Sequence, residues 1–234
     1  MMSTLPESER APRRLRSFVR RDGRKTAAQV RARAACWPQF GLEIQNGMLD
    51  YTATFQREAP RFLEIGFGSG VSLLALAEAA PAHDFIGVET HKPGVGALFL
   101  GAQAAQLTNL RVYEADAVDV LQQVIPDASL DGVQLFFPDP WPKRRHHLRR
   151  LIQPAFAALV ASKLKTGGTL HLATDWEEYA RHMMNVLSQG APWVNLAGQG
   201  QYAARSLRRP VTTKFERRAL REGRAIWDLC FSVT

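Results

Sequence analysis

The chain has 234 residues and a net charge of +8. Hydrophobic residues make up 46% of it, which is enough for one packed core with an extension. No apolar run approaches the ~18 residues of a membrane span, and the arginine-rich start lacks the apolar stretch of a secretory leader, so we expect neither. Two cysteines are too few for a disulfide framework or a cysteine metal cluster, which favours a cytoplasmic protein without a metal.

The first 60 residues carry little regular pattern. Residues 1–33 are polar and basic, and we interpret them as a flexible N-terminal arm; a transit peptide is the less favoured alternative, because the basic run shows no cleavage point. Residues 34–60 contain scattered apolar positions, which indicates irregular structure or short helices packed on the core. We therefore expect a single domain over residues 34–234.

From residue 61 onward, short apolar runs alternate with helical patterns. The runs predict strands over residues 61–67, 84–89, 110–116, 130–138, 169–175 and 225–233. Helices are predicted over 69–80, 94–107, 117–124 and 148–164, the last one kinked by Pro154 or starting near it. A further helix should begin after Asp175, with Glu178 completing a capping box. This alternation predicts an α/β fold, a doubly wound and mostly parallel sheet with helices on both faces.

An acidic residue stands at or near the end of each of the first five predicted strands. In doubly wound sheets, ligands bind beyond these carboxyl ends. The acids and the glycine loop "GFGSG" that follows the first of them are Glu64, Gly66, Gly68, Gly70, Glu89, Asp116, Asp139 and Asp175. The glycine loop lets the backbone approach a ligand closely and opens the N-terminus of a helix.

These acids narrow the range of possible ligands. Glu89 suits the two hydroxyls of a ribose, which fits a nicotinamide dinucleotide as well as other nucleosides. Glu64 would be a poor neighbour for a pyrophosphate but suits a cationic amino-acid group, and Asp116 can accept a hydrogen bond from an adenine amine. Ribose, adenine and a sulfonium amino acid together describe S-adenosylmethionine.

The charge is strongly segregated along the chain. Residues 10–33, 143–150 and 205–224 carry net charges of +9, +5 and +6, which leaves −12 for the remainder. An acidic body with basic patches suits a polyanion such as a nucleic acid. One patch begins inside "FFPDPWPKRRHH" (136–147), where two prolines flank Asp139 just before the basic run.

The segments "LEIGFGSG", "GVE", "EAD", "FFPDPWPKRRHHLRR", "ATD" and "TKFE" resemble the bacterial tRNA (guanine-N7-)-methyltransferase family, and "RSFVRRDGRKT" (16–26) is similar to its N-terminal segment. The resemblance extends from about residue 15 to residue 234. It implies a class I methyltransferase fold and transfer of a methyl group from S-adenosylmethionine to N7 of a guanine in the tRNA variable loop. It leaves open whether the protein is a monomer or a homodimer.

The resemblance also implies roles for individual residues. Glu64, the glycine loop, Glu89, Asp116 and Asp139 would bind S-adenosylmethionine, and Asp139 would also be the catalytic residue. The residues implied in substrate binding are Lys143, Arg144, Arg145, Asp175, Thr213, Lys214, Phe215 and Glu216.

Some alternatives stay open at this point. Trp141 either stacks on a base or packs at the rim, and His146 with His147 extends the basic surface more readily than it binds a metal. A cytosine-C5 mechanism needs a nucleophilic cysteine, and neither Cys36 nor Cys230 stands at a strand end. The competing functions are a non-catalytic tRNA-binding protein, a nicotinamide-dependent oxidoreductase and a protein methyltransferase.

Overall fold

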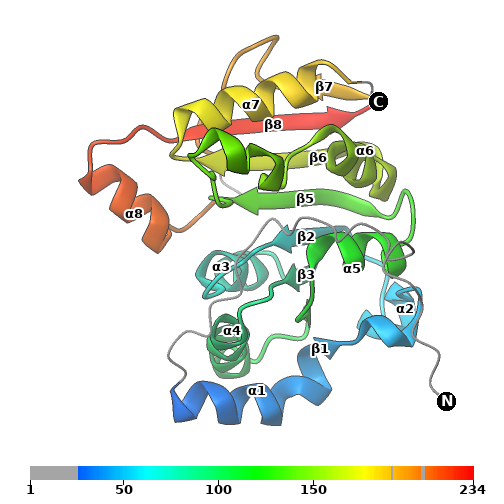
Figure 1. Cartoon of the computed structure of the whole chain (residues 1–234). Helices are drawn as coiled ribbons and strands as arrows, with labels where there is room; N and C mark the ends of the chain where they lie inside the picture. The colour runs from blue at the N-terminus through cyan, green and yellow to red at the C-terminus, as the bar shows by residue number, and fades with distance from the viewer. Residues whose placement is uncertain (1–25, 191, 207–208) are drawn as a thin grey trace, which may run out of the picture.

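The computed structural model describes residues 26–190, 192–206 and 209–234 (Figure 1). The helices are α1 (Ala27–Phe40), α2 (Tyr51–Phe55), α3 (Val71–Ala79), α4 (Lys92–Ala104), α5 (Ala117–Gln123), α6 (Pro154–Lys163), α7 (Glu177–Ser188) and α8 (Lys214–Arg221), with 3-10 turns η2 (Ile44–Asn46) and η3 (Arg144–Arg149). The strands are β1 (Gly41–Leu42), β2 (Arg61–Ile65), β3 (Asp84–Val88), β4 (Leu110–Tyr113), β5 (Leu130–Phe136), β6 (Leu164–Thr174), β7 (Trp193–Asn195) and β8 (Trp227–Val233).

The described strands form one eight-stranded sheet in the order β1-β4-β3-β2-β5-β6-β8-β7. Strands β1 to β6 pair in parallel, whereas β8 is antiparallel to both of its neighbours, β6 and β7. The strand order runs outward in both directions from β2 and β5, so the topological switch point lies between these two strands. The predicted doubly wound, mostly parallel sheet is confirmed.

Helices cover both faces of the sheet, as expected for parallel strands. On one face, Phe62 of β2 and Phe85 of β3 belong to a cluster with buried residues of α1, α3 and α4. On the other face, Leu63 and Ile65 pack in a larger cluster with residues of α2, α5, α6 and α7. Among the described residues, no helix has the length and apolar composition that a membrane span requires.

Helix α1 crosses the expected boundary between arm and domain at residue 33. Residues 1–25 lie outside the described residues, but Thr26 caps α1 in a capping box with Gln29, and Cys36 and Phe40 are buried. This single 14-residue helix packs on α4, whereas residues 34–60 were expected to be irregular or to form short helices. Residues 34–40 therefore pack on the core in helical form as expected, but as the second half of a longer helix whose first half, residues 27–33, was expected in the arm.

Two further expectations concern the second half of the chain. Helix α6 begins at Pro154 itself, which confirms the shifted start rather than a kink. The expected capping box at Asp175 is wrong, because Trp176 occupies the N-cap of α7 and Asp175 forms an ion pair with Arg224 at 2.8 Å. Strands β1 and β7 and helix α8 were not predicted, since they are short or have few buried apolar residues.

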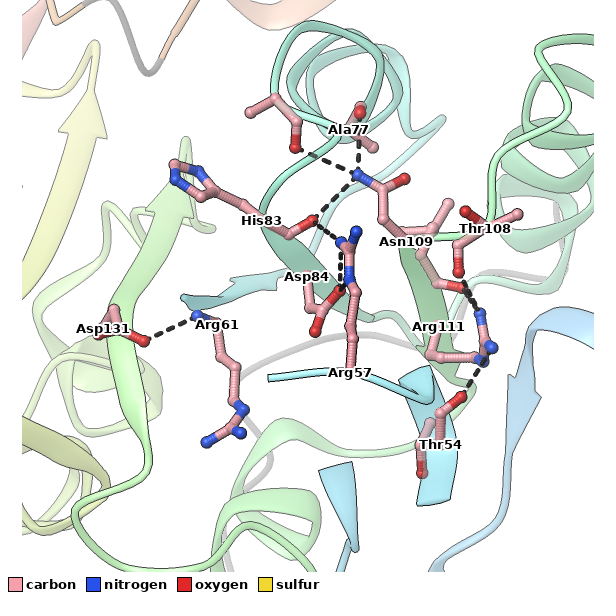
Figure 2. A network of polar contacts seen from close by, with 12 residues as sticks. Thr54, Arg57, Arg61, Ala77, His83, Asp84, Thr108, Asn109, Arg111 and Asp131 are labelled. Carbon is pink, nitrogen blue, oxygen red and sulfur yellow. Dashed lines mark hydrogen bonds and ion pairs between the residues drawn. The ribbon is translucent and has the colours of Figure 1, made fainter. Parts of the chain in front are cut away.

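A polar network ties together the amino ends of β3 and β4, at the edge opposite the strand ends that carry the acids (Figure 2). Asn109 donates hydrogen bonds to the carbonyls of Ala77, Ala80 and His83 at 3.0–3.3 Å. Arg111 donates to the carbonyls of Thr54, Thr108 and Leu110 at 2.7–3.0 Å. Because these contacts satisfy backbone acceptors between elements, this edge of the sheet is built for stability.

Candidate active site

A cavity of about 1110 Å³ lies beyond the carboxyl ends of β2, β3, β4 and β5, at the predicted edge of the sheet. Helix α8 lies off this edge, at the left of Figure 1. The predicted site residues that line the cavity are Glu64, Gly66, Gly68, Glu89, Asp116, Asp139, Thr213, Lys214 and Phe215. The edge therefore brings together the start of α8 and the predicted cofactor residues except Gly70, which does not line the cavity.

The glycine loop forms the turn from β2 into α3. Gly66, Gly68 and Gly70 all have positive φ, between 60° and 77°, which other residues adopt only with strain. The backbone of Gly68 passes so close to α4 that a Cβ on Gly94 would overlap the Gly68 carbonyl oxygen. Two glycines in contact thus let the loop sit against α4 and keep its surface open to the cavity.

Glu64 lies at the floor of the cavity and is only 4% exposed. Its Oε2 has no hydrogen-bond partner among the described residues. Burial, followed by the neighbouring charge of Glu89, raises the pKa of the Glu64 carboxyl to about 8. A buried carboxyl without a partner is costly when ionised, so the position suits a cationic ligand.

Glu89 stands at the end of β3 and holds the turn around it. Its Oε2 accepts a hydrogen bond from the Gly68 backbone N–H at 2.8 Å, and its Oε1 accepts from Thr90 and His91 N–H at 2.7 and 2.9 Å. A carboxylate has about four acceptor sites, two on each oxygen, so these bonds fill Oε1 and leave a site on Oε2. Glu89 therefore links the glycine loop to β3 and still has acceptor capacity toward the cavity.

Asp116 occupies the N-cap of α5, where its side chain accepts a hydrogen bond from the Val118 N–H at 2.9 Å. This position explains its orientation, since an N-cap carboxylate is stabilised by the first turn of its helix. Glu114 and Asp119 also line the cavity. Arg33 of α1 and Lys92 of α4 form ion pairs with Glu114.

Asp139 follows β5 in a loop with unusual backbone geometry. Phe137 and Trp141 have φ values of +53° and +45°, and Pro138 and Pro140 flank the acid directly. Non-glycine residues in this region cost about 1–3 kcal/mol each, and such strain concentrates at functional sites. Asp139 is exposed and lines the cavity.

The basic run after Asp139 lies outside the cavity. Lys143, Arg144 and Arg145 are exposed, and none of the three lines the cavity. The Arg149 guanidinium carbon lies 4.0 Å from the centre of the Trp141 ring, and His146 meets the same ring edge-on at 5.8 Å. Trp141 therefore packs within its own loop, which favours the packing alternative over base stacking.

The segment from Thr213 to Glu216 divides between cavity and core. Thr213 caps α8, and its hydroxyl accepts a hydrogen bond from the Glu216 N–H at 3.2 Å. The Phe215 side chain is exposed, whereas Glu216 is buried and turns away from the cavity toward Arg205 and Arg209. Asp175, also predicted to bind substrate, pairs with Arg224 and does not line the cavity.

Arg209 is fully buried at the centre of a charged cluster. It donates two hydrogen bonds to Asp228 of β8, at 3.0 and 2.9 Å. Its Nη1 lies 2.7 Å from Glu216 Oε2, a close ion pair that lacks the alignment of a hydrogen bond. His171 of β6 contacts Asp228 at 2.8 Å, and the guanidinium faces the Phe137 ring. This cluster fixes the start of α8 to the sheet beside the Asp139 loop.

Several cavity residues were missed by the sequence reasoning, including Gln29 of α1, His91, Lys92 and Arg217. Gln29 had a signal in the sequence, because the pattern T-x-x-Q at residues 26–29 is a capping box that predicts the start of a helix. Within the described ranges, no group of three or more potential metal ligands is found.

The mostly parallel sheet, the glycine loop and the acids at successive strand ends around one cavity define a class I methyltransferase fold. Solved structures with this fold include the 16S rRNA methyltransferase KamB, with a TM-score of 0.58, 16% identity, and coverage of 80% of this chain and 94% of that one. Another is TrmN from Thermus thermophilus, with a TM-score of 0.53, 16% identity, and coverage of 88% and 49%.

Sequence relatives identify the particular family. Residues 58–229 match the family described as putative methyltransferase. A tRNA (guanine-N(7)-)-methyltransferase of Ectopseudomonas mendocina is 56% identical over 97% of this chain and 95% of its own length. The protein of the same name from Photobacterium profundum is 51% identical, over 100% and 95%. The chain belongs to the tRNA (guanine-N(7)-)-methyltransferase family.

Family membership makes the protein an enzyme that transfers methyl groups. It removes the nicotinamide-dependent oxidoreductase that the glycine motif alone had left open, and it disfavours the non-catalytic and protein-methylating alternatives. The resemblance inferred from the motifs is confirmed over nearly the whole chain.

Proposed function

We propose that the enzyme transfers a methyl group from S-adenosylmethionine to N7 of a guanine in the variable loop of tRNA. The observation that carries this proposal is the shared cavity, which the cofactor acids, Asp139 and the start of α8 all line. Relatives that are 51–56% identical over nearly their full length bear the name of this activity.

The donor set of the cavity fits the proposed cofactor. The unpartnered carboxyl of Glu64 would receive the ammonium group, Glu89 the ribose hydroxyls, and Asp116 the adenine amine. When ionised, the three carboxylates only accept hydrogen bonds, which matches a ligand that is rich in donors. When bound, S-adenosylmethionine supplies an electrophilic methyl group on a sulfonium.

The chain's own task in the reaction is alignment and charge stabilisation. Guanine N7 has a lone pair and no proton, so no base is needed there, and the nucleophile must only lie within ~3–3.5 Å and in line. The purine gains a positive charge as it is methylated. Asp139, at the rim of the cavity, would stabilise that charge and accept a hydrogen bond from the guanine N1–H or amino group.

The RNA would be held from outside the cavity. The exposed cations of residues 143–145 start four positions after Asp139, and α8 presents further cations and Phe215 at the cavity. Phosphate contacts of this kind supply sequence-independent affinity. They would offset the cost of turning the target base outward, which is a few kcal/mol.

A methyl-transfer assay tests the proposal. The purified protein is incubated with S-adenosylmethionine carrying a labelled methyl group and with tRNA transcribed without modifications, and the RNA is digested to nucleosides. We expect the label in 7-methylguanosine from the variable loop. Label in another nucleoside, or labelled protein instead of RNA, would contradict the proposed function.

A further inference from the structure

Arg150 is a deeply buried cation near the proposed site, with a side chain that is 0% exposed. It follows η3 and precedes α6 and is not among the residues that line the cavity. Its Nε donates a hydrogen bond to the carbonyl oxygen of Pro140 at 2.9 Å. Pro140 is the residue directly after Asp139, so this arginine touches the peptide that leads away from the proposed catalytic acid.

The other end of the guanidinium is anchored to α7. Nη1 donates to Glu178 Oε1 at 3.0 Å and Nη2 donates to Oε2, a two-pronged pair that fixes the plane of the guanidinium. The guanidinium carbon also lies 4.9 Å from the centre of the Tyr179 ring. The hydrogen bond from Arg150 holds the pKa of the Glu178 carboxyl below its ordinary value, so the pair stays charged at neutral pH.

The Pro140 carbonyl is a sensitive point in the loop. The next residue, Trp141, has φ of +45°, so the peptide between them must keep an orientation that a side-chain-bearing residue rarely adopts. A donor fixed on the Pro140 carbonyl stabilises that orientation. The two prolines stiffen the chain around Asp139, but they do not by themselves choose the direction in which the loop points.

We propose that Arg150, held by Glu178, is a positioning residue that sets the Asp139 loop from α7. The Arg150 guanidinium connects Glu178 of α7 to the Pro140 carbonyl, next to Asp139. Arg150 itself does not contact the reacting atoms. It rests on the proposed role of Asp139. It also gives Glu178 a function other than the helix cap predicted from the sequence.

The test compares Arg150→Met with the matched control Arg111→Met. Arg111 likewise donates to backbone carbonyls, but at the opposite edge of the sheet (Figure 2). Its guanidinium carbon also lies over an aromatic ring, 5.0 Å from the centre of Phe55. Both variants remove a planar cation that ties segments together. Of these two arginines, only Arg150 touches the Asp139 loop, so only Arg150→Met should affect the reaction.

Three quantities are measured for each variant: the melting temperature, the Kd for S-adenosylmethionine, and kcat per cofactor-binding site with saturating tRNA. We expect Arg150→Met to lower kcat about 10²-fold, a loss that misplacing a reacting group by about 1 Å can cause. The cofactor Kd should change far less, because Glu64, Glu89 and Asp116 are untouched. Arg111→Met should lower the melting temperature and leave kcat unchanged. Arg150→Lys, which keeps the charge but not the planar fork, should fall between Arg150→Met and the unmodified enzyme.

The contradicting outcomes are distinct. A normal kcat per cofactor site for Arg150→Met would reduce Arg150 to a structural role, as would an equal loss of kcat in Arg111→Met. If Arg150→Met does not fold, Glu178→Gln serves instead, because Glu178 is half exposed and its loss frees the far end of the guanidinium. Failure of the unmodified enzyme to form 7-methylguanosine would overturn the proposed function itself, which a defect of Arg150→Met alone would not.

Discussion

The buried carboxyl of Glu64 gives the fold a pH dependence that can be calculated from its surroundings. The pKa of this carboxyl is raised from an ordinary value of 4.5 to about 8, first by burial and second by Glu89. Each tenfold change in an ionisation constant is worth about 1.4 kcal/mol. Compared with an ordinary carboxyl, Glu64 therefore lowers the free energy of unfolding of the cofactor-free protein by about 3 kcal/mol at pH 7. Well above pH 8 this loss reaches about 5 kcal/mol.

The direction of this pH dependence follows from the number of protons that the folded and unfolded states bind. Between pH 4.5 and 8, the folded protein keeps a proton on Glu64 that the unfolded chain has lost. The free energy of unfolding must therefore fall with rising pH across this window and level off above it. Glu64→Gln removes this dependence because the amide is neutral at every pH and has nearly the same shape.

The assay is urea unfolding of both proteins without cofactor, from pH 5.5 to pH 9. The variant should be the more stable protein at pH 9, by a few kcal/mol more than at pH 5.5, because all other titrations are shared. Its Kd for S-adenosylmethionine should nevertheless rise, since the cationic end of that ligand loses its partner. Parallel stability curves for the two proteins would refute the reasoning, because they would mean that Glu64 ionises as easily in the folded state as in the unfolded one.

Three other changes test the remaining parts of the site. Gly94→Ala should raise the cofactor Kd at least about 10-fold in a binding titration, because its Cβ would overlap the Gly68 carbonyl and displace the glycine loop. Arg209→Met should deprive the buried carboxylates of Asp228 and Glu216 of the buried cation that they share and cost about 3–5 kcal/mol, lowering the melting temperature by about 10 °C. Arg205→Met, at a half-exposed partner of the same cluster, should cost under about 1 kcal/mol. Replacing residues 143–145 with alanine should lower the slope of log tRNA affinity against log salt by about 2–3; an unchanged slope would mean that these cations do not meet phosphates.

The acids at the strand ends were predictable from the sequence, because the strands themselves are specified by local patterns of apolar residues. Alternating apolar runs and helical patterns specify a parallel sheet, and parallel strands deliver their carboxyl ends to one edge. Glu64, Glu89, Asp116 and Asp139 therefore had to lie near one another once the strands were placed, and all four line one cavity.

The pairings between distant segments were not predictable in this way. The sequence around Asp175 and Glu178 matched a helix cap, but Asp175 pairs with Arg224 and Glu178 with Arg150. A tertiary ion pair was stronger than the local preference in both cases, and a single sequence does not show which of many arginines supplies the partner. Helix α8 escaped prediction because only two of its residues are buried.

The central claim is that Asp139, at the rim of this cavity, promotes methyl transfer to guanine N7. The most direct measurement is the single-turnover rate of 7-methylguanosine formation by Asp139→Ala, with saturating S-adenosylmethionine and unmodified tRNA. We predict a rate about 10²–10³-fold below that of the unmodified enzyme, the usual effect of removing one group that stabilises developing charge. A rate close to that of the unmodified enzyme would contradict the claim.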